Sequence, residues 1–143
     1  MKRSTILKLA MVPMVACLLF CSSNNSPTAP PQRSFLFAMR GIPDAEGRFV
    51  AVTSNPQLLA VLEGQLALPE AQRNLHINGP VDSGNGGHNL GWSWHFEPGQ
   101  WELVEISIEL CDGRPQNVED DVDKWIADVG TFCPWASYVA AEL

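Results

Sequence analysis

The chain has 143 residues, with nine Lys and Arg against sixteen Asp and Glu and a formal net charge of −7. This length allows one folded domain. Three of the basic residues lie within the first 21 positions, so the rest of the chain carries six basic against sixteen acidic residues. Such a balance leaves no basic surface for phosphate groups, and it argues against a nucleic-acid partner.

The first 21 residues, MKRSTILKLAMVPMVACLLFC, have the organisation of a secretory signal. They begin with basic residues, and positions 6–20 are almost wholly apolar. This run is shorter than the roughly 20 apolar residues that a membrane-spanning helix needs. The sequence therefore predicts export, and it places the protein in a bacterial cell envelope, as a membrane-anchored lipoprotein or as a secreted protein.

Cys17 and Cys21 stand at the end of the apolar run, where exported bacterial lipoproteins carry their lipid. Cys17 follows the small Ala16, whereas Cys21 is followed at once by polar residues. We expect lipidation at Cys21, or at Cys17, with an ordinary cleaved signal as the alternative. Residues 22–33 are small, polar and proline-rich, which predicts a flexible linker. The folded domain is expected over residues 34–143.

The first half of the domain shows two strands and a helix. SFLFAMR (34–40) and GRFVAVTS (47–54) read as short strands around a turn-rich segment. SNPQLLAVLEGQL (54–66) predicts an amphipathic helix, with Pro56 in the first turn and Asn55 or Ser54 as its cap. LHINGPV (75–81) reads as a strand, and a glycine-rich loop over 82–89 follows it.

The second half predicts a hairpin. LGWSWHF (90–96) and WELVEISIELC (101–111) flank the turn EPGQ, which would set Phe96 opposite Trp101. The second arm alternates apolar and polar residues with a period of two, which indicates a strand. Because both faces of this hairpin would be partly apolar, we expect it to be central and covered by helices.

The end of the chain predicts a second helix and a last strand. The apolar residues of the helix are Val118, Val122, Trp125, Ile126 and Val129. Gly130 would end it, and a strand is expected from Ser137. The predicted fold is α+β, a small, mainly antiparallel sheet with two helices packed on one face.

Three short stretches resemble a known family. The segments Trp92–Phe96, Glu109–Asp112 and Cys133–Trp135 are similar to the family named for the N-terminal domain of a eukaryotic calmodulin-binding protein. The resemblance covers about residues 34–143. It implies a small secreted or surface module, often found alone in bacteria behind a signal, and it brings no catalytic residues. Because an exported bacterial domain would not meet calmodulin, that ligand does not transfer to this chain.

Two cysteines remain in the domain, Cys111 and Cys133. An even pair in an exported domain predicts one disulfide. A nucleophilic thiol is disfavoured at both positions. Pro134 removes a backbone donor after Cys133, and the charge of Asp112 would raise the pKa of the Cys111 thiol.

The candidate binding residues are His88, Trp92, His95, Asp112 and Trp135. Trp92 and Trp135 are the tryptophans expected to remain exposed, and exposed aromatic residues favour contact with a partner. We expect a binding module rather than an enzyme. Its ligand would be an extracytoplasmic protein or peptide, and it would have no cofactor, although a divalent cation could assist. The oligomeric state does not follow from the sequence.

The alternative is an extracytoplasmic hydrolase or metal-binding domain. It would use His95 with Asp112 or Glu102, since the predicted hairpin sets His95 opposite Glu102. A carboxylate there would hold the imidazole tautomer and raise its basicity.

Overall fold

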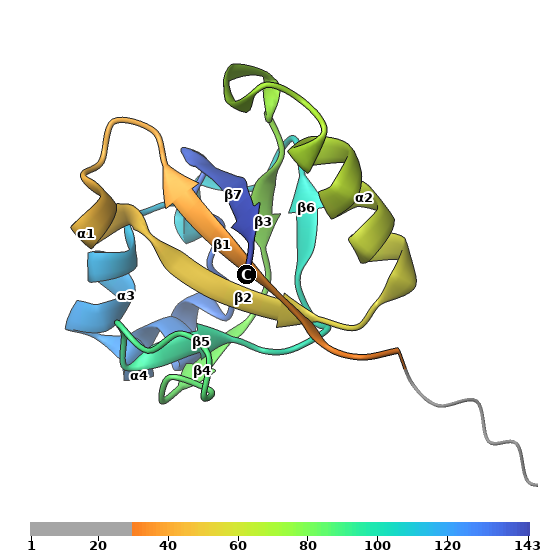
Figure 1. Cartoon of the computed structure of the whole chain (residues 1–143). Helices are drawn as coiled ribbons and strands as arrows, with labels where there is room; N and C mark the ends of the chain where they lie inside the picture. The colour runs from red at the N-terminus through yellow and green to blue at the C-terminus, as the bar shows by residue number, and fades with distance from the viewer. Residues whose placement is uncertain (1–29) are drawn as a thin grey trace, which may run out of the picture.

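The computed structural model describes residues 30–143 (Figure 1). The predicted signal, most of the linker and both candidate lipid sites, Cys17 and Cys21, lie outside the described residues.

A three-stranded antiparallel sheet joins the two ends of the domain. β1 (Arg33–Met39) lies between β2 (Phe49–Thr53) and β7 (Ser137–Glu142), and these are the first two and the last of the predicted strands. The one-turn helix α1 (Asp44–Gly47) connects β1 to β2. The first and last strands of the domain are therefore neighbours in its centre (Figure 1).

α2 (Pro56–Leu66) is the predicted amphipathic helix. The side chain of Asn55 caps it by accepting hydrogen bonds from the backbone N–H groups of Gln57 and Leu58. Leu58 and Leu62 are buried, and the helix packs against β6 and β7. Figure 1 shows β6 beside the helix. The predicted cap, start and apolar face are all confirmed.

The strand pairing in the middle of the chain corrects the prediction. β5 (Trp94–Phe96) and β6 (Glu102–Val104) do not pair with each other. Instead β5 pairs antiparallel with β4 (Val81–Ser83), and β6 pairs antiparallel with β3 (His76–Asn78). The chain therefore folds back through the glycine-rich loop before β5. EPGQ does form the predicted turn, with the Gln100 N–H donating to the Glu97 carbonyl at 3.1 Å, but this turn lies within one arm and does not join two paired strands.

Gly79 lies where the other arm bends, between β3 and β4. A Cβ atom on Gly79 would stand 2.5 Å from the Cβ of Trp101, so only glycine allows this approach. Gly79 also exchanges two backbone hydrogen bonds with Phe132, and the indole of Trp101 donates to the carbonyl of Val52 at 2.9 Å. Trp101 is thus held in the core rather than opposite Phe96.

The predicted strand over 101–111 is regular only as far as Val104. β3 begins at His76, which is the partner of Val104, so later residues have no strand to pair with. Residues 105–108 are irregular, and Glu109–Cys111 forms a single 3₁₀ turn, η2. The alternating pattern therefore does not mark a buried strand here.

The predicted second helix is broken into pieces: α3 (Pro115–Asp120), α4 (Val122–Lys124) and the π-helical turn η3 (Trp125–Val129). The break lies at Asp121, whose backbone leaves the helical region and whose side chain caps α4. Gly130 ends the segment in the left-handed region with φ 76°, as predicted. A further 3₁₀ turn, η1 (Glu70–Gln72), follows α2.

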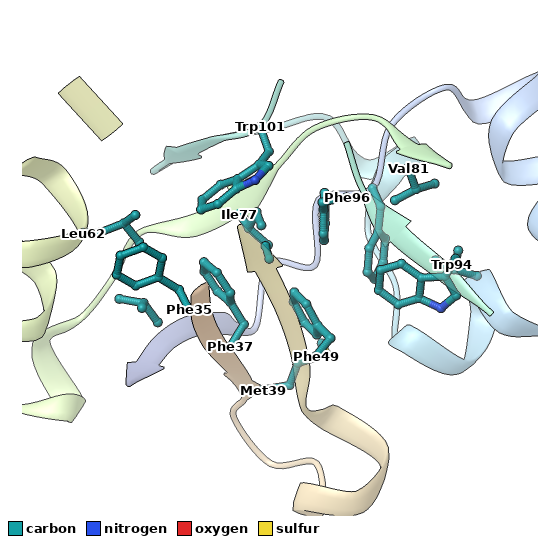
Figure 2. Close-up of a cluster of buried hydrophobic side chains, with 14 of the residues drawn as sticks. Phe35, Phe37, Met39, Phe49, Leu62, Ile77, Val81, Trp94, Phe96 and Trp101 are labelled. Carbon is teal, nitrogen blue, oxygen red and sulfur yellow. The ribbon is translucent and has the colours of Figure 1, made fainter. Parts of the chain in front are cut away.

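Aromatic side chains fill most of the core (Figure 2). Phe37 stacks on Phe49 at 5.5 Å and meets Trp101 edge-on at 5.7 Å. Trp94 packs edge-on against Phe132 at 5.4 Å. Phe49 of the central sheet also packs on Trp94 of β5 at 5.9 Å, so aromatic contacts connect the central sheet to both smaller strand pairs. The domain is an α+β fold of small antiparallel sheets, as predicted.

Candidate functional site

His88 and His95 lie together beside the glycine-rich loop, with perpendicular rings whose centroids are 5.4 Å apart. Nδ1 of His88 is 2.9 Å from the Gly86 carbonyl, and Nδ1 of His95 is 2.8 Å from the Gly84 carbonyl. A carbonyl only accepts, so each neutral ring carries its proton on Nδ1. Burial lowers the pKa of His88; its bond to Gly86 opposes this, and the nearby charge of His95 adds to it.

The predicted contact between His95 and Glu102 is wrong. His95 stands opposite Asp82 in the β4–β5 pair, whereas Glu102 stands opposite Asn78 in the β3–β6 pair. Over residues 30–143, no cluster of three or more His, Cys, Asp or Glu side chains is arranged to hold a metal ion. The structure therefore does not assemble the predicted acid–base pair.

Trp92 is only partly exposed, although the sequence predicted an open aromatic surface there. Its Nε1 donates a hydrogen bond to the carbonyl of Arg48 at 2.8 Å, and its ring lies 6.0 Å from that of the buried Trp94. Trp92 thus fastens the segment between the glycine-rich loop and β5 to Arg48, the residue before β2, and it extends the aromatic core outward.

The disulfide end of the domain holds the other two predicted residues. Cys111 and Cys133 form the predicted disulfide, with Cα atoms 5.1 Å apart. It closes a loop of 22 residues, worth about 3 kcal/mol in the chain-entropy model. Asp112 accepts a hydrogen bond from the backbone N–H of Trp135 at 2.9 Å, and Trp135 is 47% exposed. Both cysteine sulfurs are in the bond, so neither serves as a nucleophile.

The five predicted residues thus form two separate groups. His88 and Trp92 line one cavity, and Asp112 and Trp135 line another, and the two cavities have no residue in common. The five residues therefore do not share one binding cavity.

An exposed strip of large apolar side chains lies at the disulfide end. We call it the apolar ribbon; its members are Ile106, Ile108, Leu110 and Trp135, exposed to 86%, 63%, 67% and 47%. Exposed apolar side chains are ordinary when they are scattered. Here three of them fall within residues 106–110, and Ile106 lines the same cavity as Trp135, which makes this region a candidate interaction surface. The three aliphatic members are visible in the sequence, but their alternating pattern suggested burial.

His76 joins the ribbon to the core. It is 4% exposed, and its Nε2 lies 2.7 Å from the hydroxyl oxygen of Ser107. Burial lowers the pKa of His76, and the charge of Asp112 partly opposes that shift. This contact holds the irregular segment after β6 in place, which keeps Ile106 and Ile108 turned to the outside. No sequence pattern singles out His76 for this role.

Comparison with known proteins identifies one relationship. The family model for the N-terminal domain of calmodulin-binding protein 74 matches residues 33–143. No curated protein and no solved structure matches the chain significantly. Over residues 30–143, no helix has the length and apolar character that a membrane crossing requires.

Proposed function

Because the chain belongs to the family of this calmodulin-binding-protein N-terminal domain, we propose that it is an exported, membrane-tethered domain that binds a protein or peptide outside the cytoplasm. The family supports a binding role, and the apolar ribbon is the observation that carries the proposal. Burial of apolar surface is the dominant favourable term in most protein–protein association, and tryptophan is enriched among the residues that contribute most to binding energy. No catalytic step is part of this function.

The ribbon is rigidly presented, which favours binding. The disulfide fixes its C-terminal end at Cys111, and the His76–Ser107 contact fixes its middle. A surface that is already ordered loses little conformational entropy when a partner docks. The strong acidity of the domain favours a partner with basic residues near the contact.

The proposal is tested by replacing a leucine with aspartate at two positions, one inside the ribbon and one outside it. A partner is first identified by photo-crosslinking through position 108 in intact envelopes, and its affinity for the purified protein is then measured. Leu110→Asp, in the ribbon, is expected to weaken binding about tenfold or more, since a charge replaces a buried apolar contact. Leu90→Asp is the matched control, because Leu90 is 75% exposed and lies beside the glycine-rich loop.

Thermal unfolding of both variants checks that neither loses its fold. Equal affinity of Leu110→Asp and the unchanged protein would contradict the proposal. A loss of affinity in Leu90→Asp alone would also contradict it. That result would place the binding surface beside the glycine-rich loop, near His88 and Trp92.

A further inference from the structure

A cavity of about 260 Å³ lies at the start of the apolar ribbon. Its lining residues are Asn74, His76, Glu105, Ile106, Ser107 and Trp135. Drug-sized ligands occupy pockets of roughly 300–1,000 Å³, so this space suits a single side chain better than a whole small molecule.

The lining combines an apolar wall with acidic and neutral polar groups. Ile106 and Trp135 supply the apolar wall, and Trp135 also offers an aromatic face. Glu105 is exposed and brings a carboxylate, while Ser107 brings a hydroxyl oxygen. An alkyl chain fits the apolar wall, and a positively charged group fits the carboxylate and the hydroxyl oxygen.

The lining contains no cation that would compete with a bound positive charge. His76 is held neutral near pH 7, because burial lowers its pKa. Arg73 precedes Asn74 along the chain, but its guanidinium donates hydrogen bonds to the backbone carbonyls of Leu68, Val139 and Ala140. Among the lining residues, the charged group is therefore the carboxylate of Glu105, and the nearby charge of Asp112 has the same sign.

We propose that this cavity binds the lysine or arginine side chain of an extended partner segment that lies along the apolar ribbon. The stem of that side chain packs against Ile106 and Trp135, and its charged head pairs with Glu105 beside the hydroxyl of Ser107. The inference rests on the proposed function, since the same ribbon is the docking surface. A second copy of this chain is a poor occupant, because Glu105 and Glu109 of each copy would face acidic residues of the other.

Short peptide probes test the cavity without the natural partner. The full-length chain in detergent micelles, labelled with ¹⁵N, is titrated with acetyl-Val-Lys-Val-amide and followed by the Trp135 indole and Ser107 amide signals. The same peptide with norleucine in place of lysine is the neutral control. We expect the lysine peptide to move both signals at lower concentration than the norleucine peptide, and we expect added salt to weaken its binding.

Two matched variants test whether Glu105 is the residue that pairs with the lysine head group. Glu105→Gln is expected to weaken binding of the lysine peptide by about 1.4- to 5-fold, the range measured for exposed ion pairs. Glu109→Gln, in the same segment but outside the cavity lining, is expected to leave the affinity unchanged. Equal binding of the norleucine peptide, or equal effects of the two variants, would overturn the proposal.

The outcome is distinguishable from that of the proposed function. If the lysine peptide fails to bind while Leu110→Asp still abolishes partner binding, the cavity proposal is wrong and the ribbon remains the docking surface. If the peptide binds as expected while Leu110→Asp has no effect on the partner, the cavity does bind a basic side chain, but the proposal that the partner lies along the ribbon is wrong.

Discussion

At the scale of single residues, His76 both holds the segment after β6 in place and makes stability depend on pH. It is nearly completely buried, it pairs with Ser107, and its pKa is lowered because burial disfavours the charged imidazole. In the unfolded chain its pKa returns to the ordinary value near 6.5. A proton therefore binds the unfolded state more readily than the folded state.

This difference predicts the direction of a pH effect. Stability from a neutral His76 is fully present above the ordinary histidine pKa, and it is lost as the pH falls below that value towards the folded pKa. His88, whose pKa is also lowered, contributes in the same direction. We expect the free energy of unfolding in urea to fall as the pH is lowered from about 7.5 to about 5, and His76→Gln to reduce that slope. An unchanged slope in the variant would show that His76 does not contribute.

Among the elements, the middle strands owe their pairing to a glycine. The pattern of residues 90–111 suggested a simple hairpin, but β5 and β6 each pair with an earlier strand. The arm formed by β3 and β4 bends at Gly79, whose backbone packs directly on Trp101. A steric requirement between residues far apart in sequence therefore decides which strands pair, although the local turn at EPGQ still forms.

Two glycine substitutions test this requirement. Gly79→Ala places a methyl group 2.5 Å from the Cβ of Trp101, and we expect it to lower stability by about 1–3 kcal/mol, the usual cost of overpacking. Gly64→Ala lies inside α2 with no atom within 4 Å of the new methyl, and we expect it to raise stability by about 0.5–1 kcal/mol. Chemical denaturation measures the free energy of unfolding of both variants. If Gly79→Ala were as stable as Gly64→Ala, the proposed role of Gly79 would be wrong.

For the molecule as a whole, the proposed export and attachment would decide where the acidic domain meets its partner. The disulfide suits an oxidising compartment. The N-terminal residues predict a signal with a lipid on Cys21 or Cys17. A domain held to a membrane in this way would encounter envelope proteins at high local concentration.

Mass spectrometry of the membrane fraction tests the predicted attachment. We expect the mature protein to begin at Cys21 and to carry lipid mass, and we expect Cys21→Ser to release it from membranes while Cys17→Ser does not. More than one acyl chain is needed for firm anchoring, so the added mass should correspond to several chains. The reverse result would move the lipid to Cys17, and unlipidated mature protein would contradict the tether.

Local patterns were enough to predict the α+β class, the first two strands and the last, the capped helix α2 and the disulfide. Each of these depends on neighbouring residues or on a small choice among cysteines. Long-range packing determines the rest: the pairing of the middle strands, the exposure of Ile106, Ile108 and Leu110, and the separation of His95 from Glu102. The physical reason is that an alternating apolar pattern specifies a strand only when a partner strand is available. Here the partner strand β3 begins only at His76, which pairs with Val104. The apolar residues after Val104 have no strand to pair with, so they stay on the surface.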